Sequence, residues 1–376
     1  MGPKFRKIIR ISFISATVLV LLFYLLACLV PFLNAGKYPY IALMGLAFPL
    51  VFLGLLAFII YWGIKKSKWA LICIALSLLG WRQISVFFSF HTPKKMEFSK
   101  SPETLRVLSW NLSSWGESNR GIKKNYMSAM IDLIKNSQAD VICLQEYIYY
   151  KNSKYRDSII PTLKESGYKY AYFAKTNFNG RLYTTATITA VVIMSKYPIT
   201  DTLEFIYDTD NYTEPLIYAD IKVNQQTIRV FTSHLQSVKF ENHDYETLHK
   251  LKEPVTESIN QARSSAWKLR NAYKKRAIQA AMLNDKIKES PYPVIVCGDF
   301  NDVPNSYTYF TIRGNLQDAF LKKGSGFGRT FRHISPTLRI DYILADKKFE
   351  VQEFNILHVK YSDHYPVIAD LKISEK

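Results

Sequence analysis

The stretch PVIVCGDFND, residues 293–302, begins as an apolar run and ends in a cluster of polar side chains. Residues 293–297 carry no charge, and their β-branched content is typical of a buried strand. Asp299, Asn301 and Asp302 follow directly after Gly298. A core strand that leads straight into acids and an amide is a candidate wall of a polar site at the edge of a sheet.

Similar short runs, apolar or alternating, recur between residue 105 and the C-terminus, and their β-branched and aromatic content predicts strands. These runs cover residues 105–110, 140–147, 185–195, 216–223, 227–235, 293–299, 339–346, 354–359 and 366–373. Helical patterns fit 121–137 and a long polar stretch near 256–289, whereas 238–255 has no clear period and predicts a loop. Strands outnumber helices, and helices lie between groups of strands. This order predicts an α+β domain of packed sheets with outer helices.

Several of these strands end in polar groups of the types that do chemistry. They are Asn111, Glu146, His234, Asp299, Asn301, Asp341, Asp363 and His364. Each one has a structural explanation when taken singly, because an Asn after a strand often caps a turn and a Glu at a strand end is often solvated. They form one site only if their strands converge at one edge, which periodicity does not show.

If the strands converge, the donor types favour a hard divalent cation. Glu146 and Asp363 would supply oxygen ligands, and Asn111 or Asn301 a neutral one, which suits Mg²⁺ with part of its water shell retained. No cluster of Cys and His with zinc spacing is present in the sequence. Asp299 would orient or deprotonate a water, and the two histidines would stabilise charge on a phosphoryl group.

Six short motifs stand in a fixed order along the chain. They are SWNL (109–112), LQE (144–146), SHLQ (233–236), GDFND (298–302), RIDYIL (339–344) and SDHYP (362–366). As an ordered set they resemble the endonuclease/exonuclease/phosphatase superfamily, which includes secreted deoxyribonucleases, exonuclease III-like apurinic nucleases, neutral sphingomyelinases and inositol polyphosphate 5-phosphatases. The resemblance implies a four-layered α/β sandwich, with two β-sheets packed face to face and helices outside.

The resemblance also implies a role for each residue. The metal would be held chiefly by Glu146, with Asp363 and Asn111 near it, and the expected ion is Mg²⁺, with Mn²⁺ as an alternative. The catalytic residues would be Asp299, which aligns the water, its phosphate-facing neighbour Asn301, the essential His364 oriented by Asp341, and the second histidine, His234. Residues 238–289 form a charged insertion between two of the motifs, either a substrate-selecting arm or a solvated helical excursion.

The first 92 residues have the composition of a membrane region. Residues 11–33 and 38–64 carry no charge, and each is long enough to cross about 30 Å of hydrocarbon as a helix. A third stretch, 69–90, is interrupted by Arg82 and Gln83 and is the weakest of the three predicted spans. Cleavage of the first stretch as a signal is the alternative, but apolar sequence continues past Cys28 and a second span follows directly.

Cations around these stretches predict their orientation. Residues 1–100 hold 12 Lys and Arg and one acid, a net charge of +11, which leaves +7 of the total +18 for the rest of the chain. Lys4, Arg6, Lys7 and Arg10 precede the first span, Lys65, Lys66 and Lys68 follow the second, and only Lys37 lies between them. The positive-inside rule therefore places the N-terminus in the cytoplasm. The following domain would then be extracytoplasmic with three spans and cytoplasmic with two.

These observations predict a multi-pass membrane region over 1–92, a linker over 93–103 and a catalytic domain over 104–376. The predicted function is a membrane-anchored, divalent-metal-dependent phosphoesterase, with endonuclease-like cleavage of phosphodiester bonds as the first interpretation. A sphingomyelinase-like or inositol-phosphate-type enzyme acting on lipid or small phosphoesters is the alternative, and a catalytically silent binding protein is a third. The expected partners are a phosphodiester or phosphomonoester substrate and the lipid bilayer, with no obligate protein partner. The four cysteines do not make a disulfide framework and are expected to be buried free thiols.

Overall fold

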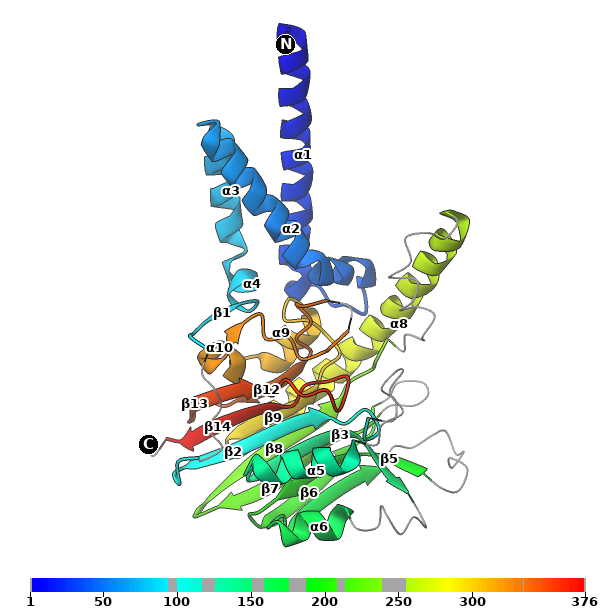
Figure 1. The fold of residues 1–376 in the computed structure, drawn as a ribbon, viewed down its shortest axis with the longest axis vertical. Coiled ribbons are helices and arrows are strands. Elements are labelled where there is room, and N and C mark those ends of the chain that lie inside the picture. Colours follow the sequence, from blue (N-terminus) through cyan, green and yellow to red (C-terminus); the bar gives the residue numbers. More distant parts are fainter. Residues whose placement is uncertain are drawn as a thin grey trace.

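The computed structural model of the chain describes residues 2–93, 100–116, 126–150, 159–175, 187–207, 214–238, 255–333 and 335–374. An N-terminal group of helices stands on a domain of two stacked sheets (Figure 1). The helices are α1 (Pro3–Leu29), the short 3-10 helix η1 (Val30–Phe32), α2 (Pro39–Ile64), α3 (Lys68–Leu79), α4 (Trp81–Ser85), α5 (Met127–Asn136), α6 (Ile159–Glu165), α8 (Val255–Lys288), α9 (Tyr307–Arg313) and α10 (Ala319–Lys323). The strands are β1 (Ser89–Phe90), β2 (Thr104–Asn111), β3 (Val141–Tyr150), β4 (Tyr170–Lys175), β5 (Thr187–Ser195), β6 (Ile199–Phe205), β7 (Leu216–Val223), β8 (Gln226–His234), β9 (Val294–Asp299), β10 (Gln317–Asp318), β11 (Ser325–Gly326), β12 (Asp341–Ala345), β13 (Phe349–Ile356) and β14 (Val367–Ile373).

Two six-stranded sheets form the body of the domain, in the orders β10-β12-β9-β8-β7-β6 and β13-β14-β2-β3-β5-β4. One apolar core lies between them, with side chains from both sheets. Leu105 and Val107 of β2 enter this core, whereas Leu108 and Trp110 of the same strand pack on the opposite face with α5 and α6. A third core joins the other sheet to α8 and α9. Because both faces of each central strand are buried, these strands read as near-continuous apolar runs. The predicted four-layered sandwich is confirmed.

Strand direction brings the polar strand ends to one edge. The pairs β2–β3 and β8–β9 are parallel, so Asn111 and Asp299 both lie at the carboxyl ends of their strands. The strands β12 and β14 run antiparallel to β9 and β2, so their amino ends lie at that same edge. Asp341 pairs directly with Asp299, and His234 pairs with Asp299 on its other side.

The predicted elements differ from the structure where side chains are exposed or boundaries are weak. The strands predicted at 216–223 and 227–235 are β7 and β8, which pair antiparallel and are joined by a turn at Asn224. The strand predicted at 354–359 begins earlier, at Phe349. The edge strand β6 has no prediction because most of its side chains face solvent and show no apolar alternation. Residues 239–254 of the insertion lie outside the described residues, and the rest of it forms the long helix α8.

Two N-terminal helices, Pro3–Phe32 and Pro39–Ile64, are long and apolar enough to cross a membrane. The third predicted span, 69–90, is divided, because α3 ends at Leu79 and a new short helix follows Gly80. A Cβ at Gly80 would overlap the Tyr24 ring hydroxyl, so the close approach of α1 requires glycine there. With 12 residues, α3 is about 18 Å long, shorter than the ~30 Å of hydrocarbon.

The N-terminal helices are packed onto the sheet domain. The Arg339 guanidinium donates a hydrogen bond of 2.8 Å to the Val86 carbonyl, and β1 pairs with β11 of the domain. Ala35 and Ala42 pack against Tyr273 and Ala277 of α8. The four cysteines are buried and free, as expected.

Candidate active site

Glu146 enters the site from a bulge in β3. Residues 145 and 146 together face a single residue of β5, since Leu144 pairs with Val192 and Tyr147 pairs with Ala190. The backbone of Glu146 has a φ of 49°, which is uncommon for a residue other than glycine. Such bulges re-aim side chains beside functional sites. The bulge lets a strand with two buried faces turn one carboxylate towards the edge, where its side chain keeps 30% exposure.

Asp299 lies at the centre of the cluster and is almost fully buried. Its carboxylate accepts hydrogen bonds from the Asn111 amide (3.0 Å), the Asn301 backbone N–H (2.8 Å) and the Asn301 amide (3.3 Å). Gly298, with a φ of 143°, precedes it, and a Cβ there would overlap the Ser233 carbonyl oxygen. Glycine therefore allows β8 and β9 to approach closely at the point where the site forms.

His364 is held against Asp341 on one side of Asp299. The Nδ1 atom of His364 lies 3.1 and 3.0 Å from the two carboxylate oxygens of Asp341, and its Nε2 atom lies 3.6 Å from Asp299 Oδ2. The Trp110 indole donates to the His364 carbonyl at 3.0 Å, which fixes the backbone. Burial opposes protonation of this imidazole, but Asp341 and Asp299 outweigh it and raise the pKa of His364 well above its ordinary value.

His234 is held by a residue that the sequence interpretation missed. Its Nδ1 lies 3.0 Å from Oε2 of Glu214, and its Nε2 lies 3.6 Å from Asp299 Oδ2 and 3.7 Å from Glu146 Oε1. Burial lowers the pKa of His234, but the three carboxylates outweigh it and raise that pKa to about 10, with Glu214 as the largest contributor. Glu214 lies just before β7, so a search of strand beginnings as well as strand ends would have found it.

In the described part of the chain, five carboxylates crowd around two imidazoles, so the acids outnumber the bases of the cluster. Burial raises the pKa of Glu146, and the charges of Asp363 and Glu214 raise it further. Burial also raises the pKa of Asp299, with Asp341 adding to the effect. Among the described residues, no Lys or Arg lies within ion-pair distance of these five carboxylates. Such an excess of oxygen donors and negative charge fits a divalent cation.

The structure brings together all eight residues predicted from the sequence. The Asn111 amide nitrogen bridges Glu146 (3.1 Å) and Asp299 (3.0 Å), while its oxygen accepts a hydrogen bond from the Ser113 backbone. The Asp363 carboxylate accepts a hydrogen bond of 3.2 Å from the hydroxyl of its neighbour Ser362. The tightest group of potential metal donors in the described residues is instead Asp299, Asp341 and His364, whose ligand atoms lie within 4.8 Å of one another.

Comparison with protein families assigns the two parts of the chain separately. The model of the Endonuclease/Exonuclease/phosphatase family matches residues 108–364, which include all eight predicted site residues and Glu214. A model described as a Domain of unknown function (DUF8431) matches residues 6–87. A search of the curated proteins finds no match to the chain.

Solved structures with the same fold include three that cover most of the sheet domain. An endonuclease/exonuclease/phosphatase from Beutenbergia cavernae DSM 12333 is 18% identical with a TM-score of 0.54, covering 72% of each chain. The human Nocturnin catalytic domain with bound sulfate anion is 17% identical with a TM-score of 0.51, covering 73% of this chain and 97% of that one. Truncated Caenorhabditis elegans TDP2 is 17% identical with a TM-score of 0.50, covering 72% and 98%. At these identities the likeness concerns the fold alone.

Proposed function

Because this chain belongs to the endonuclease/exonuclease/phosphatase family, whose members are hydrolases that act on phosphoesters, we propose that it is a membrane-anchored, divalent-metal-dependent phosphodiesterase. The observation that carries the proposal is the position of Asp299, whose carboxylate lies 3.6 Å from both His234 and His364, each paired with its own acid. A carboxylate between two oriented imidazoles can hold a water while the imidazoles face the phosphoryl oxygens.

Asp299 is the residue that orients the attacking water and accepts its proton. Its burial raises its pKa, which makes the carboxylate a stronger base than an exposed aspartate. The Asn301 backbone N–H and the Asn111 amide hold its oxygens in place. Asn301 itself is fixed by a 3.0 Å hydrogen bond to the Leu235 carbonyl, so its side chain stays beside the phosphate position.

The two histidines act on the charge that develops on the phosphoryl group. Asp341 accepts from His364 Nδ1 and leaves Nε2 as the atom that faces the reacting group. Glu214 holds His234 in the same way. Neighbouring acids raise the pKa of both imidazoles, which favours the protonated form that donates a charged hydrogen bond.

Glu146 and Asp363 would hold the metal, and Mg²⁺ is the ion whose ligand preference their oxygens match best. Asn111 would hold Glu146 in place, since its amide nitrogen donates to Glu146 while its oxygen accepts from Ser113. When bound, such an ion polarises the phosphoryl oxygen and neutralises charge in the transition state. The crowding of carboxylates without Lys or Arg supports this assignment. We place the cation beside Glu146 because its carboxylate keeps 30% exposure, whereas Asp299, Asp341 and His364 form a buried group of potential donors.

Two substrate classes fit this site. The family assignment and the net charge of +7 outside the first hundred residues support a nucleic acid, cleaved in an endonuclease-like manner. A phosphoester at the membrane surface is the second candidate, because the N-terminal helices pack against Asn305, just after the GDFND motif. The helical part supports membrane anchoring, since two of its helices are long and apolar enough to span.

The test is hydrolysis by the full chain, purified in detergent and then in nanodiscs, of bis-p-nitrophenyl phosphate, DNA, RNA, sphingomyelin and inositol phosphates. We expect turnover that needs a divalent cation and disappears in Asp299→Asn. Asp285→Asn, which changes an exposed acid on α8, is the matched control and should keep full activity. No turnover of any of these substrates with Mg²⁺ or Mn²⁺ present would favour the catalytically silent interpretation.

A further inference from the structure

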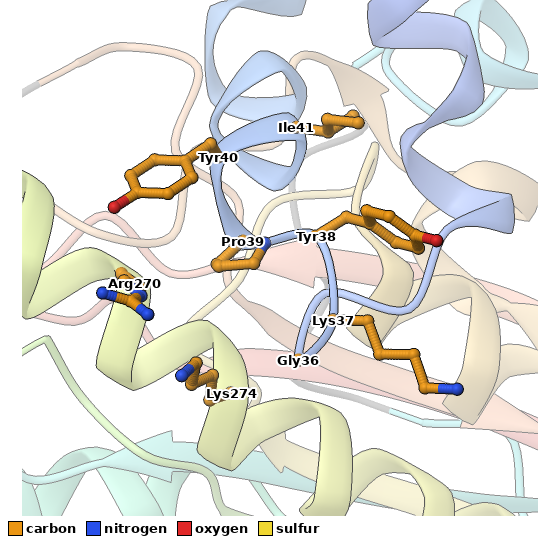
Figure 2. Close-up of a pocket in the computed structure, with 8 residues that line it drawn as sticks. All are labelled: Gly36, Lys37, Tyr38, Pro39, Tyr40, Ile41, Arg270 and Lys274. Carbon is orange, nitrogen blue, oxygen red and sulfur yellow. The ribbon is translucent and has the colours of Figure 1, made fainter.

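Another pocket lies away from the catalytic centre, between the turn that joins α1 to α2 and the helix α8. Its volume is about 260 Å³. It is lined by Gly36, Lys37, Tyr38, Pro39, Tyr40, Ile41, Arg270 and Lys274 (Figure 2). No residue of the catalytic cluster lines it, so its ligand is not the phosphoester that is hydrolysed.

The wall that α8 contributes is cationic and has no counter-charge. Arg270 and Lys274 are one helical turn apart and therefore share a face of α8. Within the described part of the chain neither forms an ion pair, and no acid lines the pocket. The Arg270 Nε atom is buried without a hydrogen-bond partner among these residues. Two like charges at this spacing repel each other, and an anion between them would relieve that repulsion.

Tyr40 completes the same side of the pocket. The Arg270 guanidinium carbon lies 5.8 Å from the centre of the Tyr40 ring. Figure 2 shows Tyr40, Arg270 and Lys274 on one side of the turn, whereas the Lys37 side chain extends away from them. The phenol and the two cations together offer hydrogen-bond donors of the kind that bind a phosphate group. These groups of the pocket favour an anion as its ligand.

The position of the pocket indicates where that anion comes from. The carboxyl end of α1 and the amino end of α2 meet at the sheet domain, and the remainder of both helices extends away from it (Figure 1). Tyr38 and Tyr40 line the pocket and have 50% and 62% of their surface exposed, and Trp267, three residues before Arg270 on α8, has 62% exposed. Exposed Tyr and Trp beside cations, at the end of an apolar helix pair, are typical of the lipid headgroup level.

We propose that this pocket binds the phosphate of an anionic phospholipid headgroup, held by Arg270 and Lys274 with Tyr40 beside them. The pocket is slightly smaller than the ~300 Å³ at which pockets for drug-sized ligands begin, so its volume suits a smaller group such as a lipid headgroup. The α1–α2 turn and α8 both line the pocket. A bound lipid would therefore contact both the membrane anchor and α8, the helix that packs against the catalytic domain. The proposal rests on the membrane anchoring proposed above and does not depend on the hydrolytic reaction.

The test uses the full chain in nanodiscs of phosphatidylcholine alone or with phosphatidylglycerol, and counts retained lipids by native mass spectrometry after transfer to detergent. Wild-type protein should retain phosphatidylglycerol in preference to phosphatidylcholine. Arg270→Ala with Lys274→Ala should lower the affinity for phosphatidylglycerol at least tenfold. Lys286→Ala with Lys288→Ala, which removes two cations from the far end of the same helix, is the matched control and should bind as wild type does. Equal retention by the pocket variant and the wild type, or no preference for the anionic lipid, would overturn the proposal.

Two further arms separate the possible failures. Titration with inorganic phosphate distinguishes a headgroup from a free ion: binding of phosphate without any retained phosphatidylglycerol would contradict the lipid assignment, and lipid retained in the presence of phosphate supports it. Arg270→Lys with Lys274→Arg keeps both charges and should keep binding, so loss in the alanine variant alone reports charge rather than misfolding. Carbonate extraction of membranes measures whether the protein is anchored, and the phosphodiester assay measures hydrolysis. Both readouts are independent of lipid retention.

Discussion

The side-chain amide of Asn305 donates a hydrogen bond of 3.1 Å to the main-chain carbonyl of Ala27, at the end of the first apolar helix. Asn305 is fully buried and follows the GDFND motif by three residues. On its other side, Gly45 of α2 comes so close that a Cβ there would overlap the Asn305 carbonyl oxygen. The N-terminal helices therefore pack directly onto the segment that follows Asp299, and that segment and the helices form one packed unit.

Asp299→Asn should lower kcat for a phosphodiester by about 10²–10⁴, the range for losing a positioned general base. The amide keeps the shape of the side chain and cannot accept the proton of the water. Thermal unfolding should show a folded protein, because the buried site loses a charge rather than a packing group. The measurement is initial rates of the purified full chain beside Asp285→Asn. Rates within twofold of wild type would remove Asp299 from the mechanism.

Glu214→Gln should lower the pKa of His234 from about 10, because it removes the carboxylate that contributes most to protonation of this imidazole. A histidine whose pKa is raised on folding stabilises the folded state. This stabilisation is complete below the pKa of the unfolded state, about 6.5, and is lost as the pH rises through the folded-state pKa of about 10. In EDTA, the pH at which the free energy of unfolding falls should therefore move down in the variant. Histidine NMR titration checks the shift directly.

His358 is the internal control for that titration. Burial, and then the charge of Arg329, lowers the pKa of His358, and neither cause involves Glu214. Its titration should be the same in wild type and variant. A shift of both histidines would indicate a general rearrangement, and a shift of neither would mean that Glu214 does not hold His234.

Removal of divalent cations with EDTA should abolish turnover, and Mg²⁺ or Mn²⁺ should restore it. Glu146→Gln should raise the Mg²⁺ concentration needed for half-maximal activity, since one hard charged ligand becomes a weak neutral one. A second readout needs no catalysis: Mg²⁺ should raise the Tm of the wild type, because a ligand that binds only the folded state stabilises it, and should do so less in the variant. Full activity in EDTA would contradict a metal-dependent mechanism.

Arg276→Ala should lower the free energy of unfolding by about 3–5 kcal/mol, the range for breaking a buried ion pair by removing one partner. The Arg276 guanidinium lies 3.3 Å from the Asp302 carboxylate, with side chains 1% and 3% exposed. It also donates to the Gln236 carbonyl at 3.0 Å, so α8 holds the segments after β8 and β9 together. Denaturant unfolding followed by tryptophan fluorescence measures the change.

Lys288→Ala is the control for that experiment. It breaks the pair with Asp285, in which both side chains are 67% exposed, and should change stability by no more than about 0.5 kcal/mol. A loss as small as this in Arg276→Ala would mean that the insertion helix is not held by the buried pair.

A reporter fused after Lys376 should be active in an extracytoplasmic compartment. The N-terminus and the turn between α2 and α3, where most of the N-terminal cations lie, are at the end of the helices far from the sheet domain (Figure 1). The positive-inside rule places that end in the cytoplasm. Although α3 alone is shorter than the hydrocarbon layer, α3 and α4 together cover residues 68–85 and return the chain to the domain, so the domain would lie on the opposite side. Alkaline phosphatase activity is the expected signal, and fluorescence of a cytoplasmic GFP fusion would reverse the orientation.

Much of the fold and the site was predictable because each strand carries its own local signal. The apolar runs around Val107, Ile142, Val230 and Ile295 predict core strands, and the eight polar residues stand at the ends of such runs. The hairpin at Asn224 follows from the same pattern. The edge strand β6 and the short helices α6 and α9 were not predictable in this way, because exposed side chains and short segments leave no period to recognise.

Local sequence indicated the candidate side chains, since a Gly-Asp-Phe-Asn turn after a buried strand, or an Asp-His pair before another strand, can be recognised within a few residues. Convergence of those groups depended on strand direction and register: the parallel β8–β9 pair, the antiparallel β12 and the bulge at Glu146 bring together residues that are up to 253 positions apart. Packing between distant segments likewise produces the contact of Glu214 with His234 and the contact of Asn305 with the first apolar helix. Periodicity shows which face of a single helix or strand is buried. The contacts between elements depend on how those faces pack together.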